Sequence, residues 1–334
     1  MSAPQDFPHE VPPEALMMWK ENWFFVGVDP ESRVATSFHW SLRPQLPEGI
    51  FSAKVVVDGT EHRYVGRSKI PKQLKGFHPV ADDCLSLEIL EEGSRYRVRF
   101  ANDEFQADIT YTARFDTFDF SDGHENPGES TMGDVGRTVF HFRHQEQALA
   151  VSGTVTVDGR TIEVGGWASR DHSWGYRDDH LFINHHWICA SFEDRFVQGT
   201  AMNERSYDGG MKFGGFVSSA AGNVPTTNID VSQTYWDTSD EAPLPPLDRD
   251  VTYELQTADG QRIEIVAKLS EDFGRLDLHY RNKERTEAYE DRLVFCTYEI
   301  PATGEVGNGV LEIGKHLRGA EAVAQLRRPA AGVA

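Results

Sequence analysis

Apolar and polar residues alternate one by one along much of this chain, and this two-residue period restricts the fold more than any other feature. Such alternation places one face of a β-strand on a core and the other toward water or a cavity. The alternating apolar positions include Leu149, Val151, Val155, Val157, Val251, Tyr253, Leu255, Ile263, Ile265, Ala267 and Leu269. The chain is therefore expected to be rich in half-buried strands.

Asp-Gly pairs separate several of the alternating segments and predict tight hairpins. They lie at Asp58-Gly59, Asp158-Gly159 and Asp259-Gly260, and each accepts the positive φ angles that a two-residue turn requires. Helical periodicity is scarce, and residues 13–20 and 69–76 are predicted as short helices. Together these patterns predict an all-β protein built from antiparallel barrels or sandwiches.

Length and composition indicate a folded protein with more than one core. The 334 residues exceed what one small core needs, so two domains are expected. Cys84, Cys189 and Cys296 form no C-x-x-C pair, which predicts reduced thiols rather than a disulfide framework. The N-terminal segment has neither the basic start nor the apolar stretch of a signal peptide, so a cytoplasmic location is expected.

Charge and motifs exclude several classes of partner. The formal net charge of −20 argues against binding to nucleic acid or to anionic membrane surfaces. No apolar run is long enough for membrane insertion. There is no phosphate-binding P-loop and no dinucleotide fingerprint after a strand, so we expect no cofactor. A homodimer is compatible with these features.

The segment from Trp167 to Arg177, WASRDHSWGYR, is the strongest candidate for chemistry. A carboxylic acid among aromatic rings can be desolvated, kept protonated and used as a proton donor, which makes Asp171 the candidate general acid. Arg170 and Arg177 are close in sequence, and a guanidinium beside Asp171 would lower its pKa and disqualify it. The alternative is an Arg–Asp pair that only fixes the hairpin; on one strand, however, Arg170 and Asp171 would point to opposite faces.

His172 is the second catalytic candidate, because it could relay a proton or stabilise the conjugate base; a hydrogen-bonded histidine at a domain seam is the alternative. No metal is expected. The histidines at 172, 180, 185 and 186 lack an HxH or HExxH spacing, and adjacent strand residues such as His185 and His186 face opposite ways.

Aromatic and polar residues at strand positions could line an apolar substrate pocket, although core packing is the common alternative for each of them. The candidates for substrate binding are Trp23, Trp40, Trp174, Tyr176, His186, Trp187, Met202, Asn203, Glu204 and Phe216.

The hairpin SGTVTVDGRTIEVGGWASRDHSWGYR (152–177) resembles the signature region of the carotenoid 1,2-hydratase/AttH-like superfamily, nearest to a bacterial branch with an R-D-x-S-W-G core. ENWFFVGVDP (21–30) and GEVGNGVLEIG (304–314) are similar to the opening and closing strands of that group. The resemblance implies two lipocalin-like β-domains packed side by side, expected here at residues 1–180 and 181–334. It also implies a site for an unsaturated small molecule near the domain junction, with Asp171 in the place of the acidic residue proposed as proton donor.

These observations favour an enzyme that needs no cofactor, a lyase or isomerase. We expect it to hydrate, dehydrate, isomerise or cyclise a terpenoid- or polyketide-like hydrophobic molecule by acid catalysis. Two alternatives stay open: a carrier that binds a hydrophobic ligand without chemistry, and a template for a pericyclic reaction in which shape matters more than a proton donor.

Overall fold

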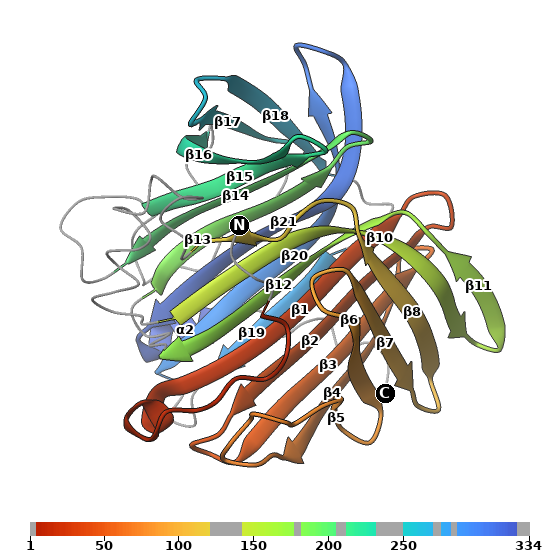
Figure 1. Ribbon diagram of the computed structural model, residues 1–334, viewed down its shortest axis with the longest axis vertical. Helices are drawn as coiled ribbons and strands as arrows, with labels where there is room; N and C mark the ends of the chain where they lie inside the picture. Colours follow the sequence, from red (N-terminus) through yellow and green to blue (C-terminus); the bar gives the residue numbers. More distant parts are fainter. Residues whose placement is uncertain are drawn as a thin grey trace.

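The computed structural model describes residues 5–120, 142–176, 182–204, 212–231, 250–269, 275–281 and 286–325. Most of these residues belong to two antiparallel β-sheets (Figure 1), which confirms the all-β prediction. Within them no helix combines the length and apolarity needed to cross a bilayer.

The first sheet has the order β4-β3-β2-β1-β12-β10-β8-β7-β6-β5, with β9 and β11 paired to β10. Its strands are β1 (Trp19–Asp29), β2 (Val34–Arg43), β3 (Glu48–Val57), β4 (Thr60–Lys69), β5 (Val80–Ala81), β6 (Leu85–Glu91), β7 (Arg95–Ala101), β8 (Phe105–Ala113), β9 (Phe118–Asp119), β10 (Phe142–Val157), β11 (Arg160–Val164) and β12 (Trp167–Tyr176). Strands from opposite halves of this sheet meet face to face, since Tyr64 of β4 contacts Phe100 of β7 with ring centroids 5.2 Å apart. The sheet therefore curls around its own core.

The second sheet has the order β18-β17-β16-β15-β14-β13-β21-β20-β19, and a further pairing of β18 with β20 closes eight of these strands into a ring. Its strands are β13 (Phe182–Ser191), β14 (Arg195–Glu204), β15 (Lys212–Ser219), β16 (Gly222–Val231), β17 (Val251–Thr257), β18 (Arg262–Leu269), β19 (Arg275–Arg281), β20 (Glu287–Ile300) and β21 (Glu305–Arg318). In the described part of the chain the helical elements are the 3-10 helix η1 (Pro13–Met18) and the short α2 (Ala320–Gln325). The sheets divide the chain between Tyr176 and Phe182, and a division into two domains at residue 180 remains our proposal.

The predicted hairpins are confirmed. Asp58-Gly59 joins β3 to β4, Asp158-Gly159 joins β10 to β11, and all four residues have positive φ. The third pair, Asp259-Gly260, lies in the turn between β17 and β18. The helix predicted at 69–76 is wrong: Pro71 lacks the amide N–H that a continuing helix needs, and Ile70 instead donates its amide to the carbonyl of Pro47.

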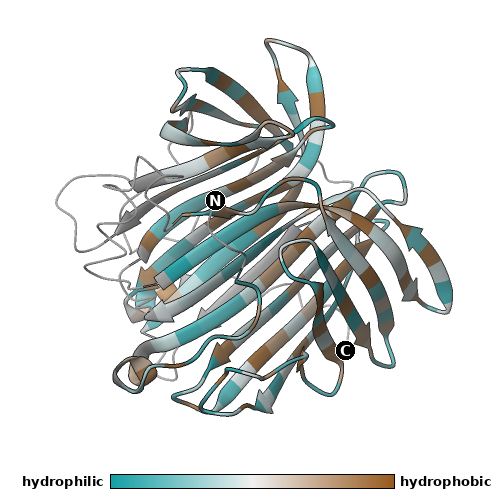
Figure 2. Ribbon diagram, viewed as in Figure 1, coloured by the Kyte–Doolittle hydropathy of each residue, from teal (hydrophilic) through white to brown (hydrophobic). Residues whose placement is uncertain are grey.

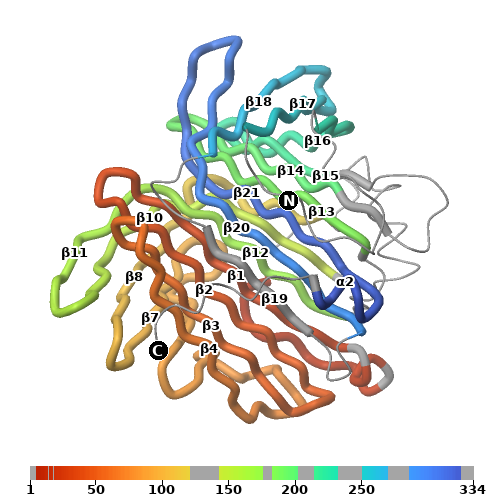
Figure 3. The backbone as a smooth tube through the Cα atoms, turned by 180° about the vertical axis from the view of Figure 1, so that it is seen from behind, coloured from red at the N-terminus to blue at the C-terminus, as the bar shows by residue number. Residues whose placement is uncertain are grey.

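The described residues form four apolar clusters: one inside each sheet, one between the sheets, and a small one where α2 packs on β20 and β21. Hydrophilic and hydrophobic bands follow one another along many strands in Figure 2. The cluster between the sheets joins Val26 and Ala148 of the first sheet to Cys189, Phe295 and Val310 of the second. Strands β1 and β12 lie against β21 and β13 at this contact (Figure 3). The central strands are consequently buried on both faces.

A buried ion pair holds the N-terminal segment inside the first sheet. Arg170 of β12 and Asp6 are both about 1% exposed, and their charged groups lie 2.9 Å apart. Tyr96 donates its hydroxyl to Asp6 and presents its ring to the Arg170 guanidinium. Removing one member of such a pair leaves a charge buried without its counterpart, which costs much more than the pair itself contributes.

We therefore expect Arg170→Met to lower the free energy of unfolding by about 3–5 kcal/mol, measured by urea denaturation. The matched control is Arg160→Met, because Arg160 forms an exposed ion pair with Asp58 at 3.3 Å and should contribute less than about 1 kcal/mol. Equal effects of the two substitutions would contradict the structural role given to Arg170.

Candidate active site

Strand β12 directs alternate side chains of the WASRDHSWGY segment to opposite sides of the first sheet. Arg170, His172 and Trp174 point into the core of that sheet, where Arg170 pairs with Asp6. Asp171 lies on the other face of the strand, which is turned toward the second sheet, and contacts His144 of the neighbouring strand β10. The Arg170 guanidinium therefore does not clamp Asp171, while Arg177 lies outside the described residues.

Asp171 belongs to a cluster of three titratable side chains on β10 and β12. Its Oδ2 lies 2.9 Å from Nε2 of His144, and the same nitrogen lies 3.3 Å from Oε1 of Glu146. Glu146 and Asp171 are direct neighbours in the register of the two strands. The Asp171 side chain is 23% exposed and that of His144 is 15% exposed, whereas Glu146 is fully buried. One imidazole thus connects an inner carboxyl with an accessible one.

The second sheet completes the surroundings of Glu146. Trp187 of β13 donates its indole N–H to Oε1 of Glu146 at 3.0 Å, and Gln198 of β14 donates its amide to the same oxygen at 3.1 Å. Phe120 stacks on the His144 ring with centroids 4.9 Å apart. The carboxyl is therefore held between the sheets by neutral donors and aromatic rings, out of reach of bulk water.

Burial and charge shift the pKa values of this cluster in a way that suits proton transfer. Burial raises the pKa of Glu146, although its contacts with His144 and Trp187 oppose the shift. Burial alone would lower the pKa of His144, but the attraction of Asp171 and the hydrogen bonds to both carboxyls outweigh it and raise the value to about 10. His144 therefore retains its proton near neutral pH.

The structure places His172 on the opposite face of the strand from Asp171. Its Nε2 lies 3.1 Å from Glu21, and its ring stacks on Trp23 with centroids 4.4 Å apart. His9 also contacts Glu21, at 2.8 Å. Burial lowers the pKa of His172, since the bond to Glu21 compensates only in part. The two predicted catalytic residues are not brought together, and a catalytic role for His172 stays a prediction.

The predicted binding residues are distributed over three environments. Trp23, Trp40 and Trp174 lie in the core of the first sheet, and His186 points into the second sheet, where its Nδ1 contacts the Tyr253 hydroxyl at 2.9 Å. Trp187 and Phe216 share the face between the sheets with Asp171. For Tyr176, Met202, Asn203 and Glu204 the structure describes only the backbone, in β12 and β14.

Sequence reasoning missed His144, Glu146 and Gln198. The available signal was the run His144-Gln145-Glu146 within a strand, because residues two apart share a face and two titratable groups on a face of an apolar strand are unusual. The contribution of Gln198 could not be found in this way, since it comes from the other sheet.

Among the residues that the structure describes, three groups of side chains have the donor atoms that divalent metals use. They are His9, Glu21 and His172; His144, Glu146 and Asp171; and His185, Asp291 and Glu312, and within each group the donor atoms lie within 4.8 Å of one another. In each group an imidazole nitrogen already contacts a carboxylate, so hydrogen bonding accounts for the arrangement. The expectation that the protein needs no metal remains a prediction.

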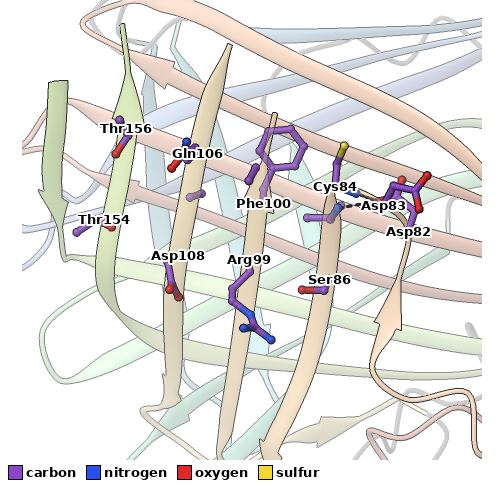
Figure 4. Close-up of a pocket in the computed structure, with 13 residues that line it drawn as sticks. Asp82, Asp83, Cys84, Ser86, Arg99, Phe100, Gln106, Asp108, Thr154 and Thr156 are labelled. Atoms are coloured by element: carbon purple, nitrogen blue, oxygen red, sulfur yellow. Dashed lines mark hydrogen bonds between the residues drawn. The ribbon is translucent and has the colours of Figure 1, made fainter. Parts of the chain in front are cut away.

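A surface groove of about 390 Å³ lies far from this cluster, on the outer side of β6, β7, β8 and β10 (Figure 4). Two of its charged groups form ion pairs: Asp108 binds Arg97, and Arg99 lies 3.5 Å from Glu88. Between the sheets, a cavity of about 10 Å³ beside Ser169 and Cys189 holds no more than one water molecule. The chemistry of the Asp171 cluster, rather than the size of either cavity, makes it the candidate site.

The raised pKa of His144 predicts a histidine that stays protonated in alkaline solution. Histidine 15N chemical shifts should show His144 as imidazolium at pH 8, whereas His186, whose pKa burial lowers to about 3, should remain neutral at pH 5. Because folding raises the pKa of His144, its protonation stabilises the folded protein at every pH below the pKa of the unfolded chain. This stabilisation is lost as the pH rises through about 10. Titration of His144 near pH 6.5 would contradict the assigned environment.

Comparisons with known proteins agree with the fold described above. A protein assigned as AttH from Nitrosomonas europaea is 16% identical over 88% of this chain and 92% of its own, with a TM-score of 0.56. Kievitone hydratase from Nectria haematococca is 12% identical over 94% and 96%, with a TM-score of 0.59. CghA, also solved with Sch210972, is 10% identical over 96% and 95%, with a TM-score of 0.59.

At these identities the likeness shows the fold, and it confirms the fold expected from the superfamily resemblance. No curated protein matches the chain. One family model matches residues 3–316, almost the full length. The chain therefore belongs to the family described as domain of unknown function DUF7064.

Proposed function

We propose that the protein is an enzyme of the hydratase or cyclase type, which transfers a proton to an unsaturated hydrophobic small molecule at the Glu146–His144–Asp171 cluster. The protonated His144–Asp171 pair delivers the proton through Asp171, because its carboxyl is the most exposed of the three. The proton that His144 holds passes across the 2.9 Å contact to Asp171 and from there to the substrate, and Glu146 holds a further one behind it. No cofactor is needed for this chemistry.

Protonation of a substrate alkene would start the reaction, and the fate of the resulting cation would decide the product. Protonation of one alkene carbon leaves positive charge on its neighbour, which aromatic faces can stabilise. Addition of water then gives a hydrated product, attack by a second double bond gives a ring, and loss of a different proton gives an isomer. The sequence resemblance implies a terpenoid- or polyketide-like substrate, and hydration is the reaction named for kievitone hydratase, one of the proteins with this fold.

The observation that carries the proposal is the dry carboxyl of Glu146 behind an accessible His144–Asp171 pair. A buried carboxyl without a counter-ion is costly unless it stays uncharged. Here Trp187 and Gln198 bind one oxygen of Glu146 with neutral hydrogen bonds, and burial raises its pKa although the His144 imidazole lies 3.3 Å away. Well-packed apolar side chains often give a folded protein the same or greater stability than buried charged groups, so stability alone does not account for this arrangement.

Incubation of the protein with a panel of isoprenoid alkenes and polyketide enones in D2O tests the proposal. Wild type should place solvent deuterium on a product carbon, detected by mass spectrometry. Asp171→Asn should lower kcat about 10²–10⁴-fold, because a positioned general acid contributes on that order. Glu163→Gln, an exposed carboxyl-to-amide change on β11, is the matched control and should keep full activity.

Other outcomes separate the alternatives. Recovery of bound ligand unchanged, with equal affinity in wild type and Asp171→Asn, would indicate a carrier. Conversion without deuterium on carbon, with Asp171→Asn fully active, would indicate a template for a pericyclic reaction. Either result would remove the proton-transfer proposal.

A further inference from the structure

A second line of hydrogen bonds lies on the same inter-sheet face, built from β13, β20 and β21. The Tyr289 hydroxyl lies 2.8 Å from Nδ1 of His185, and Nε2 of His185 lies 2.7 Å from Oε1 of Glu312. The side chains of His185 and Glu312 are 14% and 18% exposed, and Tyr289 is half-buried. A phenol, an imidazole and a carboxylate thus stand in a row, each within hydrogen-bond reach of the next.

Gly314 makes room for this row. It is the register partner of His185 on one side and of Asp291 on the other. A Cβ atom at position 314 would overlap both the His185 ring and the Tyr289 hydroxyl. The two side chains therefore meet in space that any other residue on the central strand would occupy.

The charges around Glu312 fix the direction of these hydrogen bonds. Lys54, buried on β3, is electrostatically coupled to Glu312 and Asp291 across the interface; burial lowers the pKa of its ammonium to about 8, and these carboxylates oppose the shift. A carboxylate has no proton to donate and only accepts hydrogen bonds. His185 then donates its Nε2–H to Glu312 and presents the lone pair of Nδ1 to the Tyr289 hydroxyl.

Trp187 connects this row with the Glu146–His144–Asp171 cluster. It is the direct register partner of Glu312 in the pairing of β13 with β21. Its indole N–H at the same time reaches Glu146 on the other sheet. The two groups of titratable residues therefore flank one indole ring, on a face that both sheets share.

We propose that Tyr289, His185 and Glu312 form a second proton-transfer group, in which the Tyr289 hydroxyl touches the reactants and accepts a proton from water or from a substrate hydroxyl. His185 and Glu312 are positioning residues that act through the phenol. This inference rests on the proposed function and extends it, because it requires a reaction that removes a proton from oxygen, as hydration does.

The balance for hydration is complete. One alkene carbon gains a proton from Asp171, and the neighbouring carbon bonds to the oxygen of water. That oxygen loses its extra proton to the Tyr289 oxygen while the Tyr289 proton passes to Nδ1 of His185. Glu312 stabilises the resulting imidazolium, and exchange with solvent returns both groups to their starting states. The sum is alkene plus water giving alcohol.

Benzenesulfonyl fluoride tests the second group without knowledge of the substrate. A tyrosine activated by a base attacks the sulfonyl sulfur, fluoride leaves, and the phenol proton passes to the base. Peptide mapping should show sulfonylation of Tyr289 at least about tenfold faster than of Tyr64, since a general base contributes on the order of 10² or more. Tyr64 is the internal control, because burial and its hydrogen bond to Asp82 raise its pKa.

Labelling of Tyr289 should fall to the rate of Tyr64 in His185→Phe and in Gly314→Ala, and Glu312→Gln should shift its pH profile. His39→Phe on β2, a histidine outside both groups, should leave the labelling unchanged, and circular dichroism checks the fold of each variant. Unlabelled Tyr289 in wild type, or labelling unaffected by His185→Phe, would overturn the inference.

The two proposals fail separately. Rapid labelling of Tyr289 together with full activity of Asp171→Asn would support the role of the second group and contradict that of the Glu146–His144–Asp171 cluster. Deuterium on a product carbon without labelling of Tyr289 would support the proton-donor cluster and contradict the role proposed for Tyr289.

Discussion

The structure depends on the burial of β10 and β12 on both faces. These neighbouring strands lie in the middle of the first sheet, and the second sheet packs on the side that an isolated sheet would show to water. Because side chains alternate along a strand, each of the two strands serves two different environments. Arg170, His172 and Trp174 anchor the N-terminal segment, and Asp171 faces the other half of the molecule.

The contact between the sheets combines apolar packing with buried charge. Phe118 and Phe216 stack across it with centroids 4.2 Å apart, and Val26 and Val310 belong to the same cluster. Beside this packing lie Glu146, His144 and Asp171 of the first sheet. Water is excluded there, so electrostatic effects are stronger than at a surface, and a carboxyl can keep a proton near neutral pH. The same exclusion of water would protect a carbocation or a strained intermediate.

Similar folds do not fix a function, since one fold can carry many chemistries. Kievitone hydratase and CghA share this architecture at 10–12% identity, which leaves the residues of each site to be argued separately. In this chain the argument rests on the two groups that flank Trp187. One joins two carboxyls through an imidazole, and the other ends in a phenol beside an imidazole and a carboxylate.

The sequence by itself determined the strands, several hairpins and the face on which Asp171 lies. Local physics suffices for these features, because a two-residue period and the positive φ of Asp-Gly pairs act within a few neighbouring residues. The sequence also singled out Asp171 as a carboxyl among aromatic rings. Only the tertiary structure decided that Glu146, the neighbour of Asp171 on the adjacent strand, is the more deeply buried of the two carboxyls. It also decided that Trp187 and Gln198 bind Glu146 from the other sheet. Burial and hydrogen bonding between residues 41 and 52 positions apart in the chain depend on how two sheets pack, and no local pattern encodes that packing.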